Sequence, residues 1–369
     1  MPREKSAKLL RRMPKANRLD LMKKRFSFKS PTLSEYNLKA LPLIEVVPED
    51  GLLISWSLWY LKKEVIGIGS PYTAEAKIQD LQKFINYFYY HNPNGFIKSW
   101  DKPLTYGFIE KLGDIYEVAS VRRIMATLSH FVRFLERYHI VEYDDSPVRG
   151  VKLPTAQPSP PKQLVAVSGD NDVVLEGKAV FEKLLEVAEG MIVEKKNKKQ
   201  QPYRDIAIIA TLYHGGLRVT EICNLTMAQM EKEKSGGIIF RSVKCKGNKY
   251  RDVYIKDDGS RALNEYIKNE RGSDPGPLFM SYDKKRLSRF GIWRLIKNIA
   301  HRSEMNTDKI LKIEAHPHRF RHVHAHNLKE AGFSESELMD ELGHSSMRYV
   351  GVYTKPSEQE RFKRLKKVG

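Results

Sequence analysis

A stretch rich in proline, serine and glycine divides the chain and restricts it to folds with more than one domain. It covers residues 144–172, DDSPVRGVKLPTAQPSPPKQLVAVSGDND, and has no sustained helical or strand period. Proline fixes φ and lacks a backbone donor, so such a segment interrupts regular structure. A length of 369 residues leaves room for two domains of ordinary size and an extension. We therefore predict an interdomain linker over residues 151–174.

The segment before the linker has the periodicity of amphipathic helices. Apolar residues recur at intervals of three and four in SPYTAEAKIQDLQKFINYFYYH and in SVRRIMATLSHFVRFLERYHIV. Two more helices are expected in SWSLWYLKKEVIGI and LTYGFIEKLGDIY. Four helices within about a hundred residues form a small bundle, so we predict a helical domain over residues 46–150.

A β-hairpin lies among helices in the predicted second domain, residues 175–369. FEKLLEVAEGMIVEKK and YRDIAIIATLYHGGLRVTEICNL have helical periods. GGIIFRSVKCKGNKYRDVYI is instead rich in β-branched and aromatic residues on both sides of a Lys-Gly-Asn turn. The remainder returns to helical patterns and ends in the basic segment EQERFKRLKKVG. The predicted fold class is mainly α with a small β-hairpin or sheet, an α+β arrangement.

The charge of the chain favours a polyanionic partner. The formal net charge is +19, and nucleic acid is the commonest partner of so basic a protein, with anionic membranes and ribosome-like contacts as alternatives. The first thirty residues carry eleven Lys or Arg against two acids. We predict a basic arm over residues 1–45 that contacts DNA, and a solvated tail without a specific role is the alternative.

Cysteine and hydropathy patterns indicate a cytoplasmic protein. Cys223 and Cys245 are too few for a disulfide framework, and neither belongs to a C-x-x-C pair suited to zinc. No apolar signal region follows the first charges, and no apolar run approaches the roughly 20 residues that a spanning helix needs. We therefore expect no contact with a membrane.

The segment HPHRFRHVHAH, residues 316–326, holds five histidines and two arginines in eleven positions. A metal site, a phosphate site and the polar face of a helix are the three interpretations. His318 and His322 have the spacing of two ligands on one helical face, but no Glu completes an H-E-x-x-H motif, and Arg319 and Arg321 would repel a cation. We expect neither a metal nor another cofactor.

The phosphate interpretation gains support because similar residues recur along the second domain. Guanidinium groups hold two non-bridging phosphate oxygens at once, so two of them stabilise a pentacoordinate transition state without a metal. Arginine, lysine, histidine and tyrosine together therefore indicate phosphoryl transfer to a phenol. The residues that supply these groups are Arg218, Lys244, Lys246, Lys249, His318, Arg321, His344, Tyr349 and Tyr353.

Four sequence boxes in order resemble those of the tyrosine recombinases, also called phage integrases. GLRVTE is similar to the first arginine box, KGNKYRDV to the lysine region of a β-hairpin, and HPHRFRH followed by LKEAG to the H-x-x-R box and its helix. LGH is followed nine residues later by a tyrosine in a Y-T pair. SPYTAEAKIQDLQKFINYF and SVRRIMATLSHFVRFL also resemble helices of the core-binding domain, and SPVRGVKLP resembles the exit into the linker.

The resemblance implies a role for each matching residue. Tyr353 is the nucleophile that attacks a scissile phosphodiester and forms a 3′-phosphotyrosyl bond, which needs neither ATP nor an added nucleophile. Arg218 and Arg321 bind the non-bridging oxygens. The other roles are proton donation to the leaving 5′-oxygen by Lys246, proton acceptance from the tyrosine by His318, a hydrogen bond to the phosphate from His344, and orientation of the site by Glu221.

The lysine box departs from the family pattern. Cys245 stands before Lys246, where the family usually has glycine, and Lys244 and Lys249 flank the same turn as alternatives. Tyr349 competes with the predicted nucleophile but does not fit the family spacing, so we expect it to be a packing residue.

The histidine segment also departs from the pattern. His322 matches a histidine that is usually structural in the family. His324 and His326 stand where the family more often has an apolar residue and a threonine, and we expect both on the surface of a polar helix. His316 lies just outside the box and is expected to contact only the DNA backbone. A plain ion pair between Arg218 and its neighbour three residues on is the non-catalytic alternative.

The resemblance further implies a fold and partners. A helical core-binding domain and a catalytic domain would close as a C-shaped clamp on double-stranded recombination sites. A homotetramer on DNA would assemble, with the C-terminal segment docking on a neighbour, and accessory DNA-bending or directionality proteins would join it. A free C-terminal tail is the alternative to docking. We expect action at the nucleoid, for a mobile element. Candidate DNA contacts are Lys77, Lys83, Arg122, Arg123, Lys244 and Lys249. Solvated helix faces are the alternative explanation for the first four.

Two alternatives from other classes remain at this point. A DNA-binding regulator without catalysis would have the same charge and helices, but it would lack a complete set of catalytic residue types. A type IB topoisomerase-like enzyme would use the same phosphotyrosine and relax DNA without joining two sites.

Overall fold

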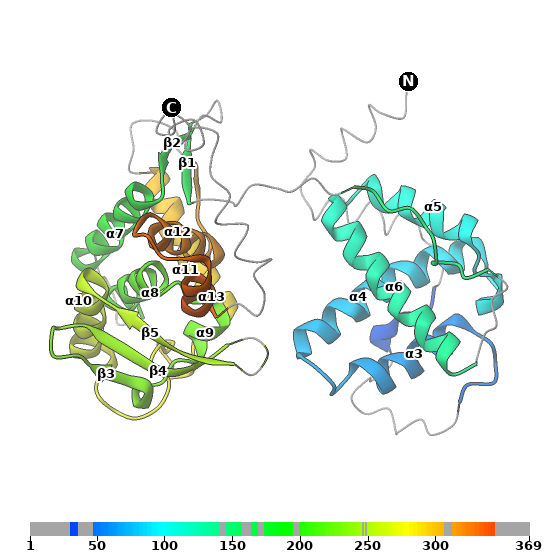
Figure 1. Cartoon of the computed structure of the whole chain (residues 1–369), viewed down its shortest axis with the longest axis horizontal. Helices are drawn as coiled ribbons and strands as arrows, with labels where there is room; N and C mark the ends of the chain where they lie inside the picture. Colours follow the sequence, from blue (N-terminus) through cyan, green and yellow to red (C-terminus); the bar gives the residue numbers. More distant parts are fainter. Residues whose placement is uncertain are drawn as a thin grey trace. The chain divides into compact units, whose positions relative to one another are not determined.

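The computed structural model describes residues 30–35, 47–139, 145–155, 164–168, 173–194, 199–245, 247, 249–305 and 312–343. Contacts within the chain divide it into two units, Met1–Pro158 and Ser159–Gly369, and Figure 1 labels their α-helices and the strands β1 to β5. The described residues are mainly helical, with two small antiparallel sheets, which confirms the predicted fold class. None of the helices in these ranges has both the length and the apolar character needed to cross a bilayer.

The first unit is a bundle of helices, as predicted from the four helical periods. Pro71 stands in the first turn of a helix, where its missing N–H is not needed. Asp101 caps another helix by accepting a 2.8 Å hydrogen bond from the backbone N of Leu104. The elements are η1 (Leu33–Glu35), α3 (Leu53–Tyr60), η2 (Leu61–Val65), α4 (Pro71–His91), η3 (Ile97–Ser99), α5 (Lys102–Gly113) and α6 (Val118–Arg137).

Aromatic side chains fill the core of this bundle. Phe84 of α4, Phe108 of α5 and Phe131 of α6 are fully or almost fully buried, and the rings of Phe84 and Trp100 have centroids 4.3 Å apart. These rings occupy the apolar positions of the helical periods, so burial of apolar area explains why α4, α5 and α6 pack together.

The second unit is built around α8 (Pro202–Gly215), a helix that is buried along most of its length. Helices α7, α10 and α12 pack on it, and Figure 1 shows it in the middle of the unit. The other helical elements are α7 (Lys178–Val193), α9 (Val219–Asn224), η4 (Met227–Gln229), α10 (Asp257–Tyr266), η5 (Ile267–Arg271), α11 (Arg289–Met305), α12 (Pro317–Glu330) and α13 (Glu335–Leu342).

Both sheets belong to the second unit. The predicted hairpin is confirmed as β4 (Ile238–Lys244) and β5 (Tyr250–Ile255), and β3 (Met230–Lys232) adds an edge strand on the β4 side. The other sheet has the order β2 (Val173–Glu176), β1 (Val165–Val167) and β6 (Lys312–Glu314). Strand β1 lies inside the segment for which the sequence predicted no regular structure, because three residues are too few to show a period.

Candidate active site

The end of α8 and the start of α9 place Arg218 and Glu221 together. Gly216 ends α8 in the left-handed region, with φ of 55°, which a glycine adopts without strain. Arg218 then occupies the N-cap position of α9, and its backbone N donates to Oε2 of Glu221 over 3.0 Å. Its side-chain Nη1 donates to Oε1 of the same carboxylate over 2.6 Å. The ion pair between Arg218 and Glu221 that the sequence spacing suggested is therefore present, at the start of α9.

Helix α12 brings Arg321 to the same carboxylate. Pro317 begins the helix, and Arg321 lies one turn further on with a side chain that is only 3% exposed. Its Nη1 donates to the carbonyl oxygen of Gly216 over 2.7 Å and lies 3.8 Å from Oε2 of Glu221. The structure therefore joins two of the sequence boxes that lie about a hundred residues apart.

A third arginine, which the sequence interpretation missed, completes this group. Arg251 of β5 has an 8% exposed side chain, and its Nη2 donates to Oε2 of Glu221 over 3.4 Å. A signal for it was present: side chains alternate along a strand, so position 251 faces the same side as the buried residues Val253 and Ile255. We call Arg218, Arg251, Arg321 and Glu221 the arginine cluster.

The arginine cluster also binds the C-terminal end of α13. Three successive carbonyl oxygens each accept from a different arginine: Glu341 from Nε of Arg251 over 2.7 Å, Leu342 from Nη2 of Arg321, and Gly343 from Nη2 of Arg218 over 3.2 Å. These carbonyls have no partner within the helix, and the helix dipole concentrates negative charge there. The end of α13, which directly precedes His344, is thus a natural site for cationic side chains.

Electrostatics keep Glu221 ionised inside the cluster. Its side chain is 2% exposed, and burial alone would raise the pKa of the carboxyl. The positive charges of Arg251, Arg321 and Arg218, with the backbone hydrogen bond from Arg218, outweigh burial and lower the pKa below its ordinary value. The group is a fixed negative charge shared by three guanidinium ions.

His318 lies on α12 one turn before Arg321 and is open to solvent. Protein atoms around the rest of its ring, and then the charges of Arg321 and Arg218, lower its pKa below the ordinary value. The imidazole is therefore neutral at pH 7 and has a lone pair that can accept a proton.

The remaining histidines of α12 are less exposed than the sequence suggested. The prediction that His324 lies on the surface is wrong: its Nδ1 is 3.2 Å from the carbonyl oxygen of Tyr213, and burial lowers its pKa to about 3. Its ring packs where a Cβ on Gly216 would stand, 2.3 Å from Cδ2. His326 is partly buried, as is His322, whose pKa burial lowers to about 4. Helix α8 thus covers the side of α12 that carries His324.

The turn end of the hairpin meets the end of α13. Cys245 is buried, and a Cβ on Gly343 would stand 2.8 Å from its Sγ. Lys244 and Lys249 are exposed on either side of the turn. Lys246, His344, Tyr349 and Tyr353 lie outside the described residues. The contact nevertheless brings together the residues that directly precede Lys246 and His344.

The candidate DNA contacts of the first unit occupy α4 and α6. Asp80 is fully buried between Arg123 and Lys83: it forms an ion pair with Nη1 of Arg123 and lies 3.6 Å from Nζ of Lys83. Arg122 donates to the carbonyl oxygen of Pro154 over 3.0 Å. The Nζ of Lys77 lies 5.9 Å from the centre of the Tyr60 ring. Each of these cations therefore has a partner within the protein.

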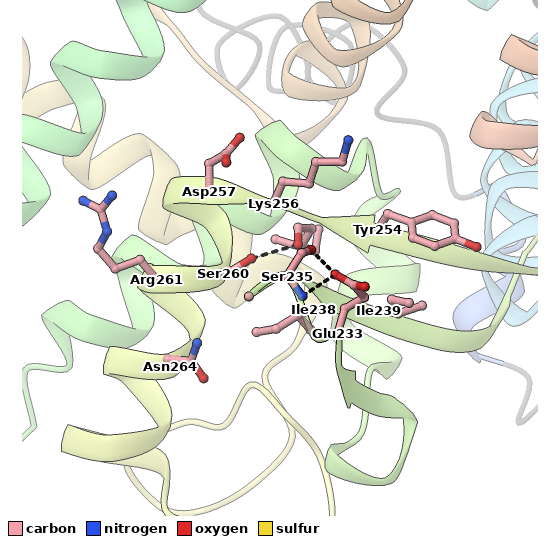
Figure 2. A pocket seen from close by; sticks show the side chains of 13 residues that line it. Glu233, Ser235, Ile238, Ile239, Tyr254, Lys256, Asp257, Ser260, Arg261 and Asn264 are labelled. Carbon is pink, nitrogen blue, oxygen red and sulfur yellow. Dashed lines mark hydrogen bonds between the residues drawn. The ribbon is translucent and has the colours of Figure 1, made fainter.

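Two pockets of the second unit lie outside the cluster. One, of about 830 Å³, is enclosed by the β3–β4 turn, the end of β5 and the start of α10. Figure 2 shows two of its polar groups in hydrogen bonds, with Ser235 joined to Glu233 and Ser260 joined to backbone. The other, of about 670 Å³, lies between α11, β6 and α12 and is called the basic pocket. It is lined mainly by Lys297, His301, Lys312, His316 and Arg319, together with Glu314.

Comparison with known proteins gives consistent matches. Residues 180–360 match the model of the phage integrase family. The chain is 31% identical over 236 residues to tyrosine recombinase XerC of Erythrobacter litoralis, a match that covers 64% of this chain and 68% of that protein. It is 25% identical over 300 residues to XerC of Herpetosiphon aurantiacus, covering 79% and 87%.

A solved structure with a similar fold is the integrase of transposon Tn1549 in complex with a circular intermediate DNA. The TM-score is 0.62 at 15% identity, with 85% of this chain and 98% of that chain covered. At this identity the likeness concerns the fold of the polypeptide.

Proposed function

Since the chain belongs to the phage integrase family of tyrosine recombinases, enzymes that cleave and rejoin DNA, we propose that it is a site-specific recombinase whose nucleophile is Tyr353. Membership confirms the resemblance that the four sequence boxes indicated. The arginine cluster carries the proposal, because Arg218 and Arg321 meet beside the helix end that leads to His344. Two guanidinium groups so arranged suit a phosphodiester, because each can donate to a non-bridging oxygen.

In the proposed reaction, the phenolic oxygen of Tyr353 attacks the phosphorus of a scissile phosphodiester. A phosphorus–oxygen bond to the tyrosine forms, and the bond from phosphorus to the 5′-oxygen breaks. The products are a 3′-phosphotyrosyl ester and a 5′-hydroxyl. Because the ester keeps the bond energy, attack by a 5′-hydroxyl from a second strand rejoins DNA without ATP.

The arginines supply charge stabilisation. Arg218 and Arg321 would bind the non-bridging oxygens, where negative charge increases as phosphorus becomes pentacoordinate. Their Nη2 atoms donate to the carbonyls of Gly343 and Leu342 in this structure. Phosphate oxygens would replace these carbonyls as acceptors, and the guanidinium planes are already held close together by Glu221.

Proton transfer is assigned to three residues. His318, neutral at pH 7 because the protein atoms around part of its ring and the two arginines lower its pKa, would accept the phenol proton. Lys246 would protonate the leaving 5′-oxygen, and His344 would hydrogen-bond the phosphate. The contact between Cys245 and the position of Gly343 supports both assignments, since it joins the two preceding segments.

The proposed substrate is double-stranded DNA that carries a recombination site. The net charge of +19 favours a polyanion, and the basic pocket beside α12 offers further cations for backbone phosphates next to the scissile one. The Tn1549 integrase, with a similar fold, was solved on DNA. We propose that the two domains close on the duplex and that Lys244 and Lys249 contact it.

The proposed setting is the movement of a mobile element within the cytoplasm, at the nucleoid. Recombination of two sites needs four strand cleavages, so we propose a homotetramer on DNA. The C-terminal segment EQERFKRLKKVG would dock on a neighbouring protomer. Accessory DNA-bending or directionality proteins would act on this assembly.

The test is covalent trapping of the full chain on a pool of nicked duplexes of random sequence, in EDTA. A nick near the cleavage site lets the freed end diffuse away, so the protein stays attached to DNA. We expect adducts that survive denaturation, from which cleavable sequences are recovered. Tyr353→Phe should abolish the adduct because it removes the attacking oxygen.

Tyr349→Phe is the matched control and should retain the adduct. Loss of the adduct in Tyr349→Phe together with its retention in Tyr353→Phe would show that the nucleophile is misassigned. Two copies of a recovered sequence on one supercoiled plasmid should give recombinant products. Relaxation of the plasmid without recombinants would instead identify a type IB topoisomerase-like activity.

A further inference from the structure

Arg251 connects three segments of the second unit from a position inside the protein. It belongs to β5 of the hairpin, its Nη2 donates to Glu221 at the start of α9, and its Nε donates to the carbonyl oxygen of Glu341 near the end of α13. Its aliphatic part lies beside Gly343, where an added Cβ would stand 3.3 Å from Cδ. None of the roles proposed above uses this side chain.

The burial of this charge requires an explanation. An arginine that is 8% exposed has lost most of its hydration, a cost that an ion pair only partly repays. Arg241, on β4 of the same hairpin, shows the ordinary alternative: it is 45% exposed and pairs with Glu231 and Asp252 at the surface. The cost of burying the Arg251 guanidinium therefore points to an effect of its charge on the groups beside it.

Without Arg251, the arginine cluster would have a lower net positive charge. Glu221 lies 2.6 Å from Nη1 of Arg218 and 3.8 Å from Nη1 of Arg321, so it attracts both groups that would bind phosphate. One carboxylate against two guanidinium ions leaves a single positive charge. With Arg251 the cluster has two, which matches a transition state formed from an anionic phosphodiester and an anionic phenolate oxygen.

We propose that Arg251 is a positioning residue that offsets the charge of Glu221 and holds the end of α13, so that the charges of Arg218 and Arg321 act on the phosphate. It acts through Glu221 and the helix end, without contact with DNA. This inference rests on the proposed function, because it concerns the same phosphoryl transfer. If Arg251 only supported folding, its replacement would have the same effect with or without the negative charge of Glu221. The proposed role predicts that the effect on the reaction rate depends on that charge.

The experiment measures the single-turnover rate of adduct formation by the full chain on one nicked duplex recovered from the random pool with wild-type protein. Arg251→Met removes the charge at similar length. We expect it to slow adduct formation by about tenfold while the affinity for the duplex changes less than about twofold. Arg251→Lys keeps the charge and should be clearly faster than Arg251→Met.

The decisive comparison adds Glu221→Gln, which removes the negative charge and keeps an acceptor for the backbone N of Arg218. In this background Arg251→Met has no carboxylate to offset, so E221Q/R251M should react within about threefold of E221Q alone. If Arg251→Met slowed adduct formation tenfold both in the wild type and in Glu221→Gln, the inference would be overturned. It would also be overturned if Arg251→Met alone reacted as fast as the wild type.

Arg241→Met is the matched control, an arginine of the same hairpin that pairs with two other acids, and it should react like the wild type. Thermal unfolding reports whether each variant folds, and Arg251→Gln replaces Arg251→Met if the latter does not. Absence of any adduct from the wild-type protein would contradict the proposed function itself. If the wild-type protein forms the adduct and Arg251→Met has the same effect with and without Glu221→Gln, only the role of Arg251 is contradicted.

Discussion

Gly216 is the residue at which backbone conformation, helix packing and the arginine cluster meet. Its φ of 55° is in the left-handed region, and its carbonyl oxygen accepts from Nη1 of Arg321 over 2.7 Å. A Cβ at this position would stand 2.3 Å from Cδ2 of His324. Two separate requirements therefore favour glycine, one from φ and one from space.

Gly216→Ala should destabilise the second unit by about 3 kcal/mol, because alanine is strained at positive φ and the ring of His324 must also move. Urea unfolding followed by circular dichroism measures this free energy. Displacement of the carbonyl that binds Arg321 should slow adduct formation as well.

Gly332→Ala separates the two causes. Gly332 has φ of 91° but nothing within 4 Å of an added Cβ, so only strain should appear, about 1 kcal/mol. Adding His324→Ala to Gly216→Ala should recover part of the lost stability. Equal losses at the two glycines would show that the close approach of His324 is not responsible.

At the scale of elements, α4 and α6 are joined by the fully buried carboxylate of Asp80. It pairs with Arg123 and Lys83, and its Oδ2 accepts from the hydroxyl of Thr127 over 3.1 Å. Arg123 and Lys83 are candidate DNA contacts, but both already pair with Asp80 within the protein. The helix pair therefore depends on them whether or not DNA is bound.

Arg123→Ala should lower the free energy of unfolding of the first unit by about 2 kcal/mol, because it leaves a buried carboxylate without its closest cation. Arg122→Ala, which removes the neighbouring exposed arginine, should change this free energy by less than about 0.5 kcal/mol. Urea unfolding measures both. Equal effects would mean that the Asp80 pair contributes no more than a surface contact.

Long periodic elements could be predicted from the sequence, and short ones could not. The periods of α4 and α6 and the strand composition around the Lys-Gly-Asn turn predicted the bundle and the hairpin. Strands β1, β3 and β6 have three residues each, and β6 pairs with a strand almost 150 positions earlier, so no local signal reveals them.

The candidate site was predictable only in part for the same reason. Family boxes supplied Arg218, Glu221 and Arg321, which the structure brings together. Arg251 was missed because a charged residue on a strand is ordinarily assigned to the solvent face, although alternation with Val253 placed it inward. His324 was misjudged because its burial depends on α8, which lies more than a hundred positions away.

For the whole molecule, charge is the property that most affects association with DNA. The first thirty residues, with eleven basic residues and two acids, contribute nine of the 19 net positive charges. Arg11→Glu with Arg12→Glu should make the dependence of log Kd on log salt less steep by about two, since each phosphate contact contributes about one. Fluorescence anisotropy on a duplex, titrated at several salt concentrations, measures the slope.

Lys178→Glu with Arg261→Glu makes the same change in net charge on α7 and α10, where both residues pair with acids at the surface. This control should leave the slope close to that of the wild type. Equal changes in the two double variants would mean that residues 1–45 are a solvated tail and that only total charge matters.

The three successive carbonyls at the end of α13 make substrate affinity and helix position interdependent. A phosphate that takes Nη2 of Arg218 or Arg321 leaves a peptide oxygen without its donor, so part of the binding free energy is spent on releasing the carbonyls of Gly343 and Leu342. Thermodynamic linkage makes this reciprocal. A change that weakens the bonds from Arg218 and Arg321 to the carbonyls of Gly343 and Leu342 should therefore tighten binding of the phosphate, and a change that strengthens these two bonds should weaken binding to the same extent.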